Sequence, residues 1–125
     1  MANQPLRGWG RLGAAWRNSV AGFRDMWAGE EAFRIEVVVF LVSIPLALWL
    51  GQSPAARALL IVSGLFVLIV EVLNSAIEAA IDRIGPERHE LSRKAKDLGS
   101  LAVLGSVLVA GIVWITALVE RFWPG

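Results

Sequence analysis

The chain alternates three long apolar runs with short polar segments. The apolar runs lie at 37–50, 58–81 and 101–119. A helix needs about 20 mostly apolar residues to cross a bilayer, so the first run is long enough only if its helix begins among the charged residues before it. The pattern predicts three transmembrane helices, at about 33–50, 58–81 and 98–119.

The segments between these runs contain residues that end helices. Gly51 and Pro54 punctuate GQSPAAR, which is short enough to predict a tight turn between antiparallel helices. Gly85 and Pro86 stop the second helix, and charged residues dominate the stretch that follows. We expect that stretch to be a loop in the aqueous phase.

A different period marks the N-terminal segment, where apolar residues recur every three or four positions. The stripe consists of Trp9, Leu12, Trp16, Val20, Phe23 and Trp27. Arg11, Asn18 and Asp25 fall on the opposite side, so the spacing predicts an amphipathic helix at about 6–28. Such a helix suits the headgroup plane of a membrane, but it could equally pack on the spans of its own protein.

Composition agrees with a small membrane protein. Of the 125 residues, 56% are hydrophobic, and the mean hydropathy is +0.60. We treat 1–125 as one integral-membrane domain of the all-α class. The chain has no cysteine, which excludes disulfides and thiolate metal sites, and its net charge of +1 with no basic block gives no reason to expect a nucleic-acid partner.

Lysine and arginine are distributed unevenly around the apolar runs. Ten of them precede the first run or lie between the second and third runs: Arg7, Arg11, Arg17, Arg24, Arg34, Arg83, Arg88, Arg93, Lys94 and Lys96. Arg57 and Arg121 lie on the other side. The positive-inside rule therefore predicts a cytoplasmic N-terminus and an external C-terminus.

The second apolar run contains polar residues that need an explanation. Glu71, Asn74, Ser75, Glu78 and Asp82 fall within a sector of roughly 100° on a helix. A carboxylate at the centre of a membrane helix costs about 2.5 to 3.5 kcal/mol, so such residues usually face a partner, water or a reaction. The spacing predicts a polar path from the cytoplasmic boundary into the membrane.

Two further charged clusters flank the same boundary. GEEAFRIE precedes the first run and KAKDLGS precedes the third. Carboxylate and amide oxygens suit Mg²⁺, and a lysine can neutralise phosphate charge. With a carboxylate able to accept a hydroxyl proton, these are the parts that phosphoryl transfer needs.

From the residues alone three functions remain open. A membrane-embedded glutamate also suits a small proton-coupled transporter, and polar groups can simply hold an oligomer together. The chain lacks a P-loop and protein-kinase motifs, and its single histidine excludes a multi-histidine metal site. The spread of charge over three clusters favours a lipid-active enzyme.

Three motifs carry a resemblance to a known family. GEEAFRIE, EVLNSAIEAAIDRIG and ERHELSRKAKDLGSLAV resemble the prokaryotic diacylglycerol kinases, small integral-membrane lipid kinases. The resemblance implies transfer of a phosphoryl group from ATP to diacylglycerol, giving phosphatidic acid. It also implies a homotrimeric helical bundle with shared active sites, in which each chain supplies a surface helix and three transmembrane helices in the bacterial inner membrane, with a periplasmic C-terminus.

The resemblance also implies roles for individual residues. Glu71 matches the general base, Asn74 orients the catalytic group, and Glu30 and Glu78 match the ligands of the Mg²⁺ that accompanies ATP. Residues that match nucleotide-side positions, besides Glu30 and Glu78, are Arg11, Asn18, Glu87, Arg88, His89, Lys96 and Asp97. Residues that match lipid-side positions, besides Glu71, are Glu36, Trp49, Arg57, Ser100 and Trp114, with Asp82 as a supporting residue. The alternative within this family is an undecaprenol kinase, since both lipids present a hydroxyl group.

Overall fold

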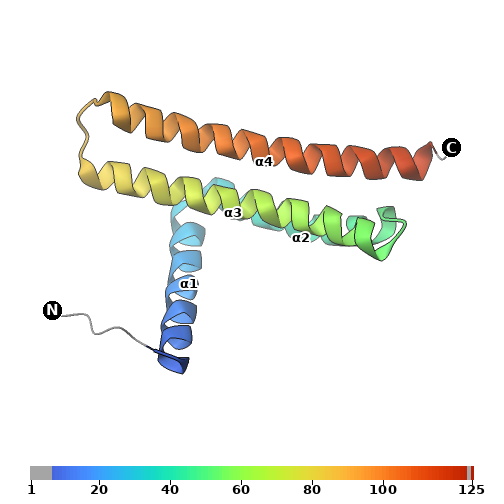
Figure 1. Cartoon of the computed structure of the whole chain (residues 1–125), viewed down its shortest axis with the longest axis horizontal. Coiled ribbons are helices and arrows are strands. Elements are labelled where there is room, and N and C mark those ends of the chain that lie inside the picture. The colour runs from blue at the N-terminus through green and yellow to red at the C-terminus, as the bar shows by residue number, and fades with distance from the viewer. Residues whose placement is uncertain (1–6, 124) are drawn as a thin grey trace. The chain divides into compact units, whose positions relative to one another are not determined.

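A computed structural model describes residues 7–123 and 125 of the chain. In this part of the chain all regular structure is helical: α1 (Trp9–Gly29), α2 (Glu31–Leu50), α3 (Pro54–Ile84) and α4 (Glu90–Phe122) (Figure 1). The chain divides into two compact units, of which the first ends at Arg34 and the second begins at Ile35.

Three of the helices correspond to the three predicted membrane spans. Helices α2, α3 and α4 are each long and apolar enough to cross a bilayer. The all-α prediction, with one N-terminal helix and three transmembrane helices, is confirmed. Residue 6, where the N-terminal helix was expected to begin, lies outside the described residues; α1 itself begins at Trp9 and ends at Gly29.

The charged stretch after α3 differs from the prediction, because most of it is helical. The connection between α3 and α4 covers only 85–89, and α4 begins at Glu90. His89 caps this helix, since its Nδ1 accepts a hydrogen bond from the Leu91 N–H at 3.0 Å. Arg93 pairs with Glu90 and with Asp97 at helical spacing, which stabilises the first turns. The many charged residues of this stretch therefore did not indicate a loop, and the loop prediction was wrong from Glu90 onward.

In the first unit, aromatic side chains stabilise the end of α1. The Phe23 ring stacks on Trp27 with centroids 5.9 Å apart and meets Phe33 edge-on at the same distance. The Arg34 guanidinium donates a hydrogen bond to the Trp27 carbonyl oxygen at 2.6 Å. Met26 and Phe33 are the buried apolar residues of this unit among those described.

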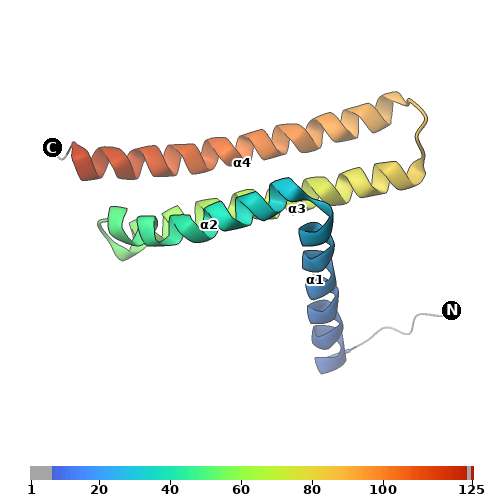
Figure 2. The same ribbon diagram turned by 180° about the vertical axis from the view of Figure 1, so that it is seen from behind.

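In the second unit, α3 and α4 run antiparallel and side by side along their length (Figures 1 and 2). Its small core lies near the turn between α2 and α3 and consists of Ala47, Leu50, Leu60 and Ala117. Helix α2 approaches α3 closely at Gly64, where an added Cβ would lie only 2.9 Å from Cδ1 of Phe40. Small residues thus allow the helices to pack without a large core.

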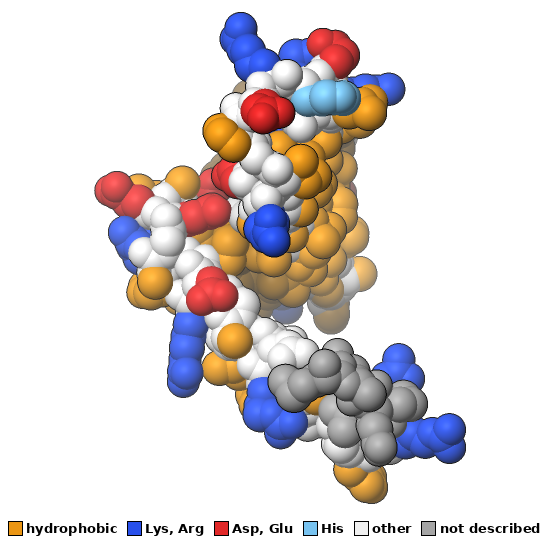
Figure 3. Space-filling model, turned by 90° about the vertical axis from the view of Figure 1, so that its left-hand side faces the viewer, with side chains coloured by type: hydrophobic (Ala, Val, Ile, Leu, Met, Phe, Trp, Pro, Cys, Tyr) orange, Lys and Arg blue, Asp and Glu red, His pale blue; other side chains and the backbone are white. Residues whose placement is uncertain are grey.

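Most other large apolar side chains of this unit face outward. Val39, Leu59, Leu101 and Ile112 are each more than half exposed. Figure 3 looks onto the end where α3 and α4 are joined: charged side chains gather there, and hydrophobic side chains cover the sides of the helices behind it. Such a surface suits lipid or further subunits rather than water.

Candidate functional site

The polar face predicted on the second span lies on one uninterrupted helix, α3. Glu71, Asn74 and Ser75 are half-buried, whereas Glu78 and Asp82 are exposed. The Asn74 side-chain amide donates a hydrogen bond to Oε1 of Glu78 at 3.3 Å. Helical spacing therefore brings these two predicted site residues into contact, as expected for positions four apart.

Helix α4 passes very close to this face at Gly99, which is buried. A Cβ added to Gly99 would lie 2.2 Å from Oδ1 of Asn74. That oxygen is itself buried, and no hydrogen-bond partner for it exists in the described part of the chain. Gly99 was not among the predicted site residues, because a glycine offers no functional group to single it out.

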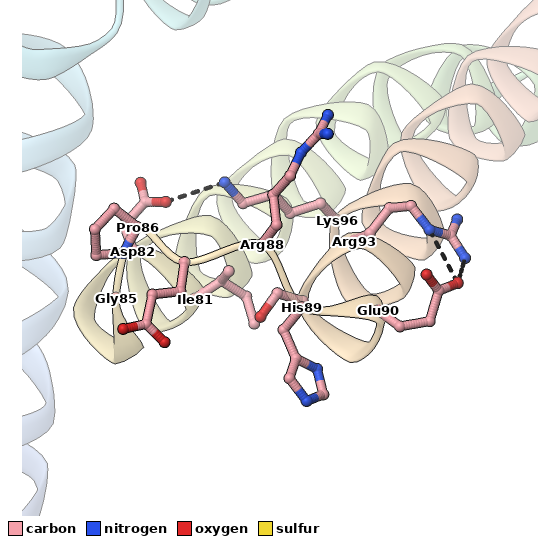
Figure 4. A pocket seen from close by; sticks show the side chains of 11 residues that line it. Ile81, Asp82, Gly85, Pro86, Arg88, His89, Glu90, Arg93 and Lys96 are labelled. Carbon is pink, nitrogen blue, oxygen red and sulfur yellow. Dashed lines mark hydrogen bonds and ion pairs between the residues drawn. The ribbon is translucent and has the colours of Figure 1, made fainter.

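Closer to the α3–α4 connection, an ion pair joins the two helices. The Lys96 ammonium donates to Oδ1 of Asp82 at 3.0 Å (Figure 4). Both side chains are exposed, Asp82 more than Lys96. The ion pair holds Lys96, a predicted nucleotide-side residue, against α3.

A pocket of about 590 Å³ surrounds this ion pair at the end of α3 and the start of α4. Its lining includes the predicted nucleotide residues Glu87, Arg88, His89 and Lys96. In Figure 4 the Arg88 side chain rises on the same side of the connection as Lys96, whereas His89 projects to the opposite side. The pocket is thus lined by both acidic and basic side chains, and the cations of Arg88 and Lys96 lie on the same side of it.

Arg93 is a second residue that sequence analysis missed. Its guanidinium bonds Glu90, and it bonds Oδ2 of Asp97 at 2.6 Å. It also lines the pocket. The spacing of Glu90, Arg93 and Asp97 at three and four residues could have indicated this network, had the segment been read as helix. Asp97, predicted to contact nucleotide, is therefore already paired with a cation.

Some predicted lipid-side residues line an apolar groove of about 370 Å³ between the three long helices. Glu36 and Trp114 lie in its wall together with Phe40, Ser43 and Leu46. Gly64 and Val107 contribute from α3 and α4. Ser100 does not line this groove; it is exposed on α4, one residue after Gly99.

The other two predicted lipid-side residues lie at the α2–α3 turn. Arg121 lies over the Trp49 ring, with its guanidinium carbon 4.8 Å from the centroid, and Phe122 lies beside the same ring. Arg57 donates through Nε to the Gly51 carbonyl oxygen at 3.1 Å. Glu71 follows Arg57 by fourteen residues on α3, which is about 21 Å along a helix. The structure does not bring Trp49 or Arg57 near the polar face.

Three predicted nucleotide-side residues belong to the first unit. Arg11 and Asn18 are exposed on α1. Glu30 separates α1 from α2 in an extended conformation and is half-buried, whereas Glu31 opens α2 and is exposed. Glu30 and Glu78 lie in different units.

The carboxylates of the second unit suit a metal that arrives with its own oxygen ligands. Nowhere in residues 7–123 do three or more His, Cys, Asp or Glu side chains gather closely enough to hold a metal ion. Mg²⁺ commonly takes one or two protein carboxylates and completes its shell with phosphate oxygens and water. Glu78, exposed and oriented by Asn74, provides an oxygen donor of this kind.

Comparison with known proteins gives matches across most of the chain. A family model described as prokaryotic diacylglycerol kinase matches residues 17–118. The diacylglycerol kinase of Escherichia coli (strain K12) is 48% identical over 122 residues, which cover 98% of this chain and 99% of that protein. The diacylglycerol kinase of Pseudomonas aeruginosa is 49% identical over 100 residues, covering 80% and 81%, and that of Haemophilus influenzae is 45% identical over 96, covering 77% and 81%.

Proposed function

Because this chain belongs to the prokaryotic diacylglycerol kinase family, it is a membrane-embedded kinase, and we propose that it phosphorylates diacylglycerol with ATP along the polar face of α3. The observation that supports this location is the continuity of that face. It runs from half-buried Glu71 to Asp82, which lines the charged pocket. A lipid hydroxyl and a water-soluble nucleotide can therefore meet on one helix.

Glu71 is the general base. Its carboxylate takes the proton of the lipid hydroxyl while that oxygen forms a bond to the γ-phosphorus of ATP. The bond from this phosphorus to the β,γ-bridging oxygen breaks, so that ADP leaves and phosphatidic acid remains in the membrane. Phosphoryl transfer depends mainly on positioning and on neutralising charge, so a small site without a large nucleotide-binding fold suffices.

The nucleotide occupies the pocket at the α3–α4 connection. Lys96, held in place by Asp82, and Arg88 provide positive charge for its phosphates. The His89 ring accepts a hydrogen bond at Nδ1 from the Leu91 N–H, which leaves Nε2 available to contact the nucleotide. Glu87 and Asp97 complete the nucleotide side in the second unit, and Arg11 and Asn18 contribute from α1.

Glu30 and Glu78 hold the Mg²⁺ that accompanies ATP, and Asn74 orients Glu78 through its amide hydrogen bond. When bound, the ion neutralises charge on the phosphate oxygens during transfer. Glu30 lies in the connection between α1 and α2, so the proposed site includes this segment, from the same chain or from another.

The acyl chains of the lipid lie along the apolar side of the second unit. The groove that contains Glu36 and Trp114 has a volume of about 370 Å³ and is lined mostly by apolar side chains. Ser100 lies near the headgroup level, whereas Trp49 and Arg57 contact the far ends of the chains. The sites are shared within a homotrimer in the bacterial inner membrane, with the N-terminus and the α3–α4 connection in the cytoplasm and the C-terminus in the periplasm.

A lipid-selective kinase assay tests this proposal. The purified protein in mixed micelles receives ATP labelled at the γ-phosphate, together with either diacylglycerol or undecaprenol. We expect labelled phosphatidic acid, formed only when Mg²⁺ is present, and little labelled polyprenyl phosphate. Dominant labelling of the polyprenol would overturn the substrate assignment and identify an undecaprenol kinase. ATP-independent proton flux in liposomes, without lipid labelling, would instead indicate a transporter.

A further inference from the structure

The contact between Gly99 and Asn74 is the tightest that any described glycine of α4 makes with a side chain. An added Cβ at Gly99 would lie 2.2 Å from Oδ1 and 3.3 Å from Cγ of Asn74. Ile77 is the next neighbour, with Cδ1 at an ordinary contact distance of 3.8 Å. Gly105 and Gly111, on the same helix, have no such neighbour within 4 Å. Among these three glycines of α4, only Gly99 lies in close contact with α3, and the side chain that it contacts most closely is Asn74.

The geometry also explains why the buried oxygen of Asn74 has no ordinary hydrogen-bond donor. It lies where a Cβ on Gly99 would be, so the Cα–H bond that a side chain would replace is directed toward the oxygen. Contacts of this kind recur at helix–helix interfaces and act as weak hydrogen bonds. A larger residue would remove both the space and the contact.

This arrangement fixes which end of the amide faces Glu78. With Oδ1 directed at Gly99, the NH₂ group is directed at the carboxylate and donates to Oε1 at 3.3 Å. The reverse orientation would place the amide oxygen against the carboxylate oxygens, and like partial charges would repel. The Glu78 carboxylate therefore selects the orientation in which Asn74 is a donor, and Gly99 leaves room for the oxygen at the other end of the amide.

We propose that Gly99 is a positioning residue: by admitting the Asn74 oxygen into the α3–α4 interface, it holds the Glu78 carboxylate ready for the magnesium–nucleotide complex. This inference rests on the proposed ligand role of Glu78. Groups that orient a metal ligand commonly affect metal affinity or activity by about 10- to 100-fold when removed. Gly99→Ala should therefore weaken the response to Mg²⁺ without weakening the helix, because alanine is the better helix former.

A spectroscopic experiment tests the contact independently of catalysis. The chain contains three asparagines, Asn3, Asn18 and Asn74. In detergent-solubilised full-length protein labelled with ¹⁵N-asparagine, the signal of Asn74 is the side-chain amide signal that disappears in Asn74→Ala. We expect Gly99→Ala to shift this signal and Gly105→Ala to leave it unchanged. An unchanged Asn74 signal in Gly99→Ala would overturn the proposal.

A kinetic double-mutant cycle tests the consequence. We expect Gly99→Ala and Asn74→Ala each to raise the Mg²⁺ concentration for half-maximal activity about 10- to 100-fold, with a much smaller change in the KM for diacylglycerol. The double variant should match Asn74→Ala alone, because removing the asparagine side chain removes the collision. Gly105→Ala should behave like the unchanged protein. Multiplied losses in the double variant would show that Gly99 acts elsewhere and would overturn the proposal.

The same cycle remains decisive if Gly99→Ala fails to fold. Folding of the double variant, measured by circular dichroism, would then show that the collision with Asn74 was the cause and would support the contact. Failure of both variants would overturn it. If Glu78→Gln leaves the Mg²⁺ dependence unchanged, the ligand assignment fails, while the ¹⁵N experiment still decides whether Gly99 orients Asn74.

Discussion

At the residue scale, the two glutamates of the α3 polar face have different surroundings. Glu78 is exposed and accepts a hydrogen bond from Asn74, so its carboxylate is held in place. Glu71 lies about 10 Å farther along the helix from the α3–α4 connection and is half-buried. Among the residues that the structure describes, none forms a hydrogen bond or ion pair with the Glu71 carboxylate. This difference supports a base at Glu71 and a metal ligand at Glu78.

Replacing Glu71 by glutamine should abolish turnover and preserve nucleotide binding. The change removes the proton acceptor and keeps the size of the side chain, and loss of a general base typically costs about 10²- to 10⁴-fold in rate. Labelled-lipid formation measures the rate, and calorimetric titration with a non-hydrolysable ATP analogue and Mg²⁺ measures binding. Near-normal turnover in Glu71→Gln would rule out the base assignment.

Glu78→Gln should instead weaken the response to Mg²⁺, because an amide oxygen is a poorer ligand for a hard cation than a carboxylate. We expect the Mg²⁺ concentration for half-maximal activity to rise by about 10-fold or more. Glu120→Gln is the matched control: Glu120 is exposed near the end of α4, and it is the backbone oxygen of this residue that accepts a bond from Gln52. Equal Mg²⁺ dependence in the two variants would contradict the ligand role.

At the scale of elements, the apolar pattern predicted the number and order of the helices but not where α3 and α4 meet. Long apolar runs determine a membrane span, and they gave α2, α3 and α4. The first turns of α4 depend instead on a cap at His89 and on ion pairs among Glu90, Arg93 and Asp97. The many charged residues of this segment led to the wrong prediction of a loop. Likewise, the contact between Gly99 and Asn74 depends on how α4 is aligned along α3, and the spacing of apolar residues within one helix does not specify this alignment.

The ion pair between Lys96 and Asp82 gives a prediction that distinguishes an effect on ATP binding from an effect on the stability of the fold. Both partners are exposed, and an exposed pair usually contributes less than about 1 kcal/mol to folding. Lys96→Met should therefore raise the KM for ATP substantially and change the melting temperature little. Steady-state kinetics and thermal unfolding followed by tryptophan fluorescence provide the two measurements. A large loss of stability with an unchanged KM would show that Lys96 serves the fold rather than the nucleotide.

Helix α1 gives a second prediction at this scale. The aromatic side chains of its apolar stripe are exposed: Trp9 is 88% exposed and Trp16 is 72% exposed. Aromatic side chains with arginines around them suit the headgroup region, so we expect α1 to lie in the interface. A variant that keeps Trp16 as its single tryptophan, reconstituted with lipids brominated at different depths, should be quenched most by the shallowest bromines. Absence of quenching at every depth would indicate that α1 packs on protein instead.

At the scale of the whole molecule, a single chain leaves many large apolar side chains exposed. Apolar side chains cover the sides of the long helices (Figure 3). Three spans are also too few to enclose a lipid and a nucleotide together. These features together favour sites built between subunits.

Shared sites make a distinctive prediction for mixed oligomers. If Glu71 and Glu30 of one site come from different chains, an inactive Glu71→Gln chain and an inactive Glu30→Gln chain can assemble one site that carries neither substitution. Unfolding the two purified variants together, refolding them in lipid micelles and measuring labelled phosphatidic acid should therefore recover activity that neither variant shows alone. Separately refolded variants, mixed only afterwards, are the control and should stay inactive. Absence of recovery, with cross-linking showing that mixed oligomers form, would place both residues of a site on one chain.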